Sequence, residues 1–146
     1  MGSEANFRFS EGKDPEENYW VTRQWLSELD FMKDEHQFYE DMLEKFTLPV
    51  IESNHFTEVK GHLEHLSRAL KKREELEKRI KDHKTNQSNF LEKVAGAPKK
   101  EQIKSEHKKL ARELHEFLKE YKEVKKGIFQ SISQVMKDQK RDRLLP

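Results

Sequence analysis

Two pairs of residues on neighbouring predicted helices could together bind a metal ion. The predicted ligands are His36, Glu40, His62 and His65. The first two lie one turn apart on a helix predicted over residues 15–47, and the other two lie one turn apart on the next helix. Both pairs are a similar number of residues from the connection between the helices, so a hairpin brings them to similar heights. Three imidazoles and a carboxylate suit zinc or a similar divalent ion, and a ligand position left to water would allow hydrolysis.

Two interpretations without a metal compete with this site. In the first, His36 and His62 belong to a polar core layer, in which acids such as Glu40 or Glu58 hold neutral imidazoles and His65 is solvated. In the second, the histidines are unconnected surface residues. A metal titration of the melting temperature distinguishes the metal site from both alternatives.

The motifs of the common catalytic sites are absent from the sequence. There is no Gly-x-Ser-x-Gly elbow, no glycine-rich phosphate loop and no dinucleotide fingerprint. A ferritin-type di-iron centre needs two Glu-x-x-His pairs, and this chain has one, Glu52 to His55. The chain contains no Cys, which excludes thiolate zinc sites, disulfides and cysteine nucleophiles. We therefore expect no enzymatic activity.

A second polar cluster is expected at the connection between the last two helices. His83, Gln87 and His107 lie about one turn apart across this connection, and Arg73 lies on the same helix face farther from it. Polar groups at seam positions usually fix the register of helices or mark a hydrated end. The alternative function for this cluster is a proton-sensitive switch.

The helix predicted over residues 15–47 must position much of this chemistry, and it has two apolar faces. One face carries a stripe with steps of three, four and seven residues, made of Trp25, Leu29, Met32, Tyr39, Leu43 and Phe46. The opposite face carries Trp20, Phe31 and Phe38. A helix that is hydrophobic on both sides is normally surrounded by neighbours.

The second face therefore predicts a protein contact through Trp20, Phe31 and Phe38. The partner is a second copy of this chain, or a helix of another protein that docks on the aromatic side chains. Two alternatives need no partner. The N-terminal arm with Phe7 and Phe9 could cover these side chains, or a twist of the helix could partly bury both faces.

The helix boundaries follow from local signals. Asp14 and Pro15 are a capping residue and a first-turn proline, so the first helix should begin there. Pro49 should end this helix near residue 47, with a Pro-kinked helix to Ile51 as the alternative. Gly96 suits a left-handed cap at the end of the second helix. Residues 84–89 contain poor helix formers, so a kink or loop can occur there.

These boundaries predict an all-α fold, an elongated antiparallel three-helix bundle with coiled-coil-like packing. We expect a flexible arm over residues 1–14, one domain over 15–139 with helices at about 15–47, 54–95 and 98–139, and a frayed charged tail over 140–146. This layout is similar to that of spectrin-type repeats, a likeness that carries no function.

Charge is unevenly distributed along the chain. Residues 1–53 contain 5 Lys or Arg and 13 Asp or Glu, for a net charge of −8, and residues 54–146 contain 24 and 15, for +9. Basic runs such as Lys71-Lys72-Arg73 raise nucleic acid as a third and weaker candidate partner. Interleaved acids argue against it, because they form oppositely charged pairs at helical spacing. The acidic and basic helices can also neutralise each other within the fold.

The composition agrees with narrow helical seams and gives no sign of a membrane protein. Hydrophobic residues make up 33% and charged residues 39% of the chain, which suits long helices better than a thick globular core. No segment approaches the roughly 20 apolar residues that a membrane span needs, and we see no signal peptide. We therefore expect a cytoplasmic protein.

Overall fold

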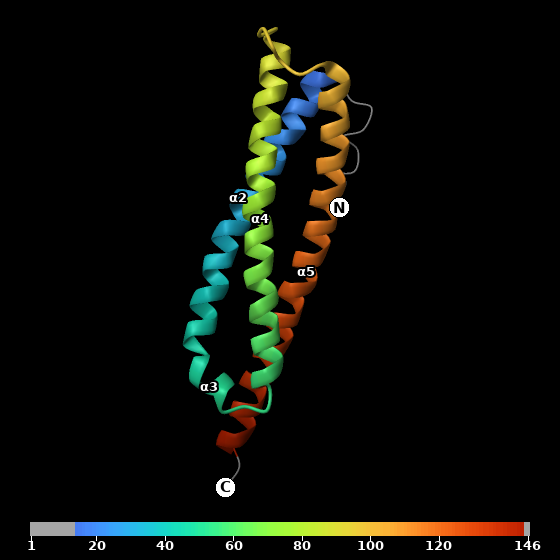
Figure 1. Ribbon diagram of the computed structural model, residues 1–146. Helices are drawn as coiled ribbons and strands as arrows, with labels where there is room; N and C mark the ends of the chain where they lie inside the picture. The colour runs from blue at the N-terminus through green and yellow to red at the C-terminus, as the bar shows by residue number, and fades with distance from the viewer. Residues whose placement is uncertain (1–13, 145–146) are drawn as a thin grey trace. The chain divides into compact units, whose positions relative to one another are not determined.

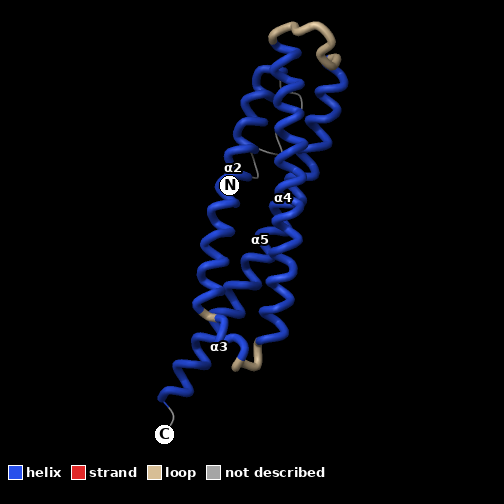
Figure 2. The backbone as a smooth tube through the Cα atoms, turned by 60° about the vertical axis from the view of Figure 1, so that its left-hand side comes forward, coloured by secondary structure: helices blue, strands red, loops and turns tan. Residues whose placement is uncertain are grey.

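The computed structural model describes residues 14–144, and this part of the chain is all-helical (Figure 1). The helices are α2 (Pro15–Lys45), the short α3 (Thr47–Ile51), α4 (Phe56–Leu91) and α5 (Lys100–Leu144). Figure 2 shows short loops between long helices and no strand within the described range. The predicted all-α class with three long helices is therefore confirmed. The arm with Phe7 and Phe9 lies outside the described residues.

Helix α2 begins where its capping signal predicts. The Asp14 carboxylate accepts a hydrogen bond from the backbone N–H of Glu17 at 2.8 Å, so it serves as the N-cap, and Pro15 occupies the first helical position. Glu16 and Glu17 lie in the first turn, where the helix dipole favours negative charge.

The end of α2 differs from the expectation. The helix ends at Lys45, and residues 47–51 form the separate helix α3 after a turn at Phe46. Pro49 is the third residue of α3, a position whose N–H has no acceptor within a helix, so the ring does not prevent this turn from forming. Ser53 then closes the segment, because its hydroxyl donates to the carbonyl of Val50 and accepts from the N–H of His55.

Helix α4 is continuous through residues 84–89 and ends at Leu91, before the predicted residue 95. Lys93 takes the left-handed capping conformation (φ 58°) that we had assigned to Gly96. The Val94 N–H bonds to the Asn89 carbonyl and the Lys93 N–H to the Phe90 carbonyl, which is the hydrogen-bond pattern of a Schellman cap. Gly96 also has a positive φ of 83°, but it lies in the loop beyond this cap.

Helix α5 is longer than predicted at its C-terminal end. It starts at Lys100, where the side chain of Gln102 accepts a hydrogen bond from the Lys99 N–H and so caps the first turn. It runs to Leu144, so residues 140–144 of the expected frayed tail are helical. Arg141 and Arg143 lie in its last turn, where positive charge is favourable.

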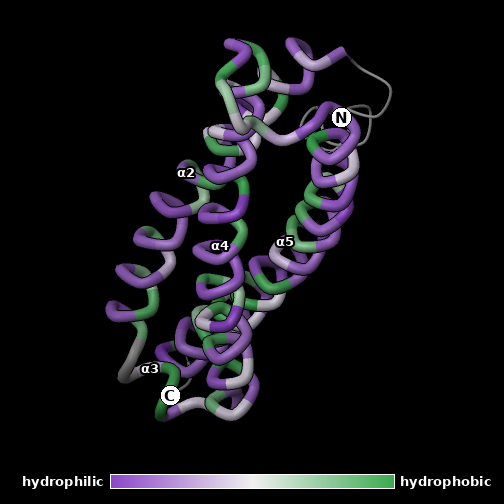
Figure 3. The backbone as a smooth tube through the Cα atoms, turned by 45° about the horizontal axis from the view of Figure 1, so that its top comes forward, coloured by the Kyte–Doolittle hydropathy of each residue, from purple (hydrophilic) through white to green (hydrophobic). Residues whose placement is uncertain are grey.

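Contacts between the helices divide the described residues into two compact units, and α2, α4 and α5 each contribute to both. The first unit contains residues 14–32 and 71–118, and its fully buried side chains include Trp25, Leu29, Leu76, Ile80, Leu110 and Leu114. The second unit contains residues 33–70 and 119–144, and its buried side chains include Tyr39, Val59, Leu66, Ile128, Ile132 and Val135. Figure 3 shows how hydrophobic positions alternate with hydrophilic ones along each long helix. None of the helices within residues 14–144 has an apolar stretch that could cross a membrane.

Candidate functional site

The aromatic residues predicted to bind a partner are exposed on α2. The exposed fraction is 55% for Trp20, 64% for Phe31 and 57% for Phe38, whereas Trp25 on the other face is fully buried. Phe38 contacts the ring of its neighbour Tyr39 edge-on at 5.8 Å, which leaves most of its surface free. The folded chain thus buries one apolar face of α2 and exposes the other. Coverage of Trp20, Phe31 and Phe38 by a partner stays a prediction.

The exposed surface of α2 is also acidic. Seven of its acidic residues are exposed, namely Glu16, Glu17, Asp30, Asp34, Glu40, Asp41 and Glu44. Its exposed basic residues are Arg23, Lys33 and Lys45. A partner for the aromatic side chains would therefore meet a negatively charged rim.

The structure brings together only one pair of the predicted metal ligands. His36 Nε2 lies 2.7 Å from Glu40 Oε1, whereas His65 is exposed on α4. Within residues 14–144, no group of three or more His, Asp and Glu side chains is arranged to hold a metal ion. Metal binding by His36, Glu40, His62 and His65 stays a prediction without support from the arrangement of these side chains.

The remaining residue of the predicted metal site, His62, packs against Gly127 of α5. A Cβ atom added at Gly127 would lie 2.5 Å from Cε1 and 2.8 Å from Nδ1 of His62. The imidazole therefore occupies the space that a Cβ atom at position 127 would need, so any other residue there requires the His62 ring to move. The carboxylate of Glu58 is 3.9 Å from His62 Nε2. No such neighbour explains Gly61, whose Cβ position has no atom within 4 Å.

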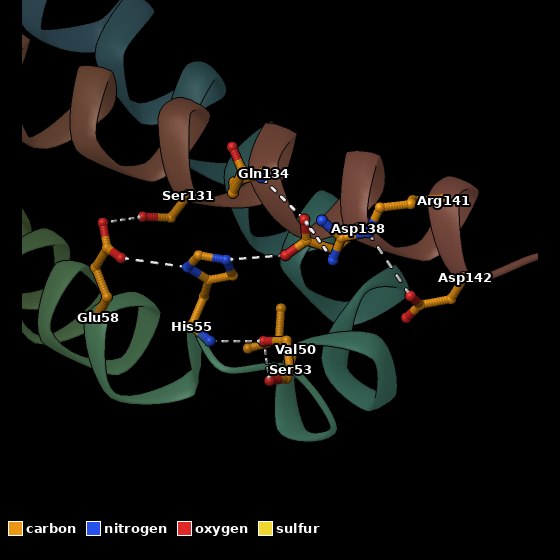
Figure 4. A network of polar contacts seen from close by, with 9 residues as sticks. All are labelled: Val50, Ser53, His55, Glu58, Ser131, Gln134, Asp138, Arg141 and Asp142. Atoms are coloured by element: carbon orange, nitrogen blue, oxygen red, sulfur yellow. Dashed lines mark hydrogen bonds and ion pairs between the residues drawn. The ribbon is translucent and has the colours of Figure 1, made fainter. Parts of the chain in front are cut away.

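A polar network around His55 joins the start of α4 to α5 in the second unit (Figure 4). His55 Nε2 lies 3.1 Å from Asp138 Oδ2, and its Nδ1 lies 3.5 Å from Glu58 Oε2. Ser131 donates a hydrogen bond to Glu58 Oε1 at 2.9 Å, and this bond is the main reason why the pKa of Glu58 is lowered. Gln134 donates to Asp138 Oδ1 and is the main cause of the lowered pKa of Asp138.

This network resembles a catalytic site in its residue types but not in its connections. The hydroxyl of Ser131 bonds to the Glu58 carboxylate and not to His55, so the network does not pair a serine nucleophile with a histidine base. The network can hold the two helices in register. The sequence signal for it is the spacing of Ser131 and Asp138, two turns apart on one face of α5.

The second polar cluster that we predicted is buried in the first unit. His83 and His107 are each 1% exposed, Gln87 is 2% exposed and Arg73 is 5% exposed. His83 Nε2 and His107 Nδ1 are 2.8 Å apart, and the Trp25 ring stacks on His107 at 4.6 Å with an interplanar angle of 16°. Residues of α2, α4 and α5 therefore meet in one polar layer.

Burial keeps both histidines neutral at neutral pH. Desolvation lowers the pKa of His83 from 6.5 to about 4, and desolvation together with the neighbouring His83 lowers the pKa of His107 to about 3. A neutral pair shares one hydrogen bond, so one ring donates and the other accepts. The outer nitrogens, His83 Nδ1 and His107 Nε2, have no hydrogen-bond partner within residues 14–144. A buried polar group without a hydrogen-bond partner lowers the stability of a folded protein by about 1–3 kcal/mol.

The buried guanidinium of Arg73 connects α4 to α2 in the same unit. Its Nη1 donates to the backbone carbonyl of Leu29 at 3.2 Å and lies 3.6 Å from a carboxylate oxygen of Glu77. This pairing lets a charged group be buried among apolar side chains. Arg73 thus fixes the position of α4 against α2.

The basic runs of α4 and α5 are partly paired with acids. Arg79 donates two hydrogen bonds to the carboxylate of Glu113, each 2.7 Å long, and these bonds raise the pKa of Arg79 and lower that of Glu113. In the second unit, the Lys125 ammonium donates to Glu35 at 3.1 Å. Nucleic-acid binding by these helices stays an untested prediction.

Comparisons with known proteins do not assign a family. No family model matches the chain, and neither the curated proteins nor the solved structures contain a significant match.

Proposed function

We propose that this protein is a non-enzymatic helical interaction module that self-associates through the exposed face of α2. The observation that carries this proposal is the exposure of Trp20, Phe31 and Phe38, each more than half accessible in a single copy. Large aromatic side chains are the residues that most often anchor protein interfaces. Their exposure on a helix whose opposite face buries Trp25, Leu29, Met32 and Tyr39 favours a further neighbour.

The charge of the chain favours a second copy as this neighbour. Seven exposed acids and three exposed bases share α2 with the aromatic side chains, and residues 54–146 of the same chain carry a net charge of +9. Apposition of α2 on the basic surface of another copy would therefore join complementary potentials. In a two-fold dimer this contact would occur twice.

The architecture that we propose for the module is an antiparallel three-helix bundle with coiled-coil-like packing. Contacts among α2, α4 and α5 within each unit support it. In the first unit, His107 contacts both Trp25 and His83. In the second unit, α5 reaches α2 through Lys125 and Glu35 and α4 through Ser131 and Glu58. Such a bundle presents long helix faces, which suit protein contacts better than catalysis.

Sedimentation equilibrium of the wild type and of a Phe31→Ala/Phe38→Ala variant tests the proposal. We expect a wild-type dimer and a monomeric variant, because the substitution removes two anchors of the interface. The control is Ile51→Ala, which removes an exposed apolar side chain of α3, outside both α2 and the basic residues 54–146, and should leave the dimer intact. A dimer that survives Phe31→Ala/Phe38→Ala would contradict an interface on α2.

A further inference from the structure

Helices α2 and α5 lie side by side and run in the same direction in the second unit. The Lys125 ammonium of α5 donates to Glu35 of α2 at 3.1 Å, and the Tyr39 ring lies edge-on to the Phe129 ring at 5.4 Å. Both contacts join residues that are 90 positions apart, since 125 − 35 = 90 and 129 − 39 = 90. The two helices are therefore parallel, and each residue of α2 is level with the residue of α5 that lies 90 positions later.

The α2 part of the surface that these helices share is aromatic and acidic. Phe38 is 57% exposed and contacts Tyr39, the residue that also contacts Phe129. Asp34 and Asp41 are exposed and lie one turn before and one turn after Phe38, on the same helix face. Negative charge therefore flanks an exposed aromatic side chain next to α5.

The α5 part of this surface is apolar and basic. With about 3.6 residues per turn, a sector of about 80° around the axis of α5 contains the basic face, which consists of Lys122, Lys126, Phe129, Met136 and Lys140. All five side chains are exposed, Phe129 to 44% and Met136 to 48%. The acidic residues of α5 in this unit lie outside the sector, namely Glu120, Glu123, Asp138 and Asp142. The basic face therefore presents positive charge around two apolar side chains.

These two parts are complementary to each other. A two-fold axis parallel to the helices places α2 of one copy opposite α5 of the other, and this pairing occurs twice. Phe38 is level with residue 128, so it can meet Phe129 of the second copy. Asp34 is level with residue 124, which lies about 3 Å along the helix axis from both Lys122 and Lys126. Apolar groups thus face apolar groups, and acids face bases.

We propose that α2 of one copy docks on the basic face of α5 in a second copy, around a two-fold axis parallel to these helices. The inference rests on the proposed self-association and names the surface that receives α2. A nucleic acid or an anionic membrane would suit the lysines alone, because Asp34 and Asp41 on the adjoining helix repel a polyanion. A second copy satisfies both parts of the surface at once.

Charge reversal on each helix tests the pairing by sedimentation equilibrium of the full chain. Lys122→Glu/Lys126→Glu places acids opposite the acids of α2, and Asp34→Lys/Asp41→Lys places bases opposite the bases of α5. Each variant alone should dimerise at least about tenfold more weakly than the wild type. An equimolar mixture of the two should form a heterodimer, because every acidic face then meets a basic one. Two variants that stay monomeric when mixed would overturn the pairing of α2 with α5.

A matched control separates α5 from the other basic helix. Lys60→Glu/Arg68→Glu reverses two exposed bases of α4 in the same unit, gives the same net charge as Lys122→Glu/Lys126→Glu, and should dimerise as the wild type does. An equal loss of the dimer in this control would refute the assignment to α5. If a charge-reversal variant is unfolded by circular dichroism, Lys122→Ala/Lys126→Ala replaces it and should also weaken the dimer.

The same experiment distinguishes this inference from the proposed function. A wild type that is monomeric at every concentration would refute self-association itself, and this inference with it. A dimer that is lost in Phe31→Ala/Phe38→Ala but kept in Lys122→Glu/Lys126→Glu would leave self-association through α2 standing. That result would overturn only the basic face of α5 as the receiving surface, and would leave its lysines to a polyanion.

Discussion

Acidification is expected to destabilise the first unit through the buried pair of His83 and His107. Both histidines have a lowered pKa in the folded chain, because burial disfavours their charged forms. The unfolded chain therefore binds more protons than the folded chain below the ordinary histidine pKa of about 6.5. The stability contributed by neutral burial is fully present above this pKa. It is lost as the pH falls from about 6.5 towards the folded-state values.

The expected loss can be worked out for His83. With a folded pKa of about 4 and an unfolded value of 6.5, lowering the pH from about 7.5 to about 4.5 removes about 2.5 kcal/mol from the free energy of unfolding. His107 acts in the same direction. Carboxylates with a lowered pKa, such as Glu113, lose their contribution only at lower pH, so the window between about 6 and 4.5 reports mainly the histidines.

Urea unfolding followed by tryptophan fluorescence measures this effect, because both tryptophans, Trp20 and Trp25, belong to the first unit. A His83→Leu/His107→Leu variant should lose much less stability than the wild type between about pH 7.5 and pH 4.5. The exposed His65→Leu serves as the control and should follow the wild type. Equal losses in the wild type and the double variant would refute the assignment of neutral, buried histidines.

Two substitutions test the local backbone features. Gly127→Ala should destabilise the second unit by about 1 kcal/mol in thermal unfolding followed by circular dichroism, because the new methyl meets the His62 ring. In a His62→Ala background the same substitution should stabilise the unit by about 1 kcal/mol through helix propensity. Destabilisation in both backgrounds would exclude the ring as the cause. Lys93→Gly should raise the free energy of unfolding, measured with urea, by about 0.5–1 kcal/mol, because glycine adopts the left-handed conformation without strain. The control Lys93→Ala should show no such gain. A gain with alanine equal to that with glycine would contradict this explanation.

The sequence patterns predicted the features that depend on local signals. The start of α2 follows from Asp14 and Pro15, and its division into a buried and an exposed apolar face follows from helical periodicity. The burial of His83 and His107 was predictable from their positions on the seam. The capping and periodicity signals of α2 lie within a few residues of each other, so contacts elsewhere in the fold do not change them.

Features that depend on the exact ends of helices were not predictable. Gly96 was the better sequence candidate for the cap of α4, but Lys93 takes that role, because the cap is set by where the last turn stops packing. A cavity of about 230 Å³ that is lined by Asp14, Gln87 and Lys100 likewise depends on where α2 and α5 begin and where α4 ends. The contact between His62 and Gly127 could be anticipated only as a close approach, since the glycine does not reveal which side chain fills its space.

The solution mass of the wild-type protein is the measurement that bears most directly on the proposed role of α2. Self-association predicts a mass near twice the 17.6 kDa of one chain, with the fluorescence of the exposed Trp20 shielded from a soluble quencher in the dimer. A mass of 17.6 kDa at every concentration, with Trp20 fully open to the quencher, would contradict self-association through this face.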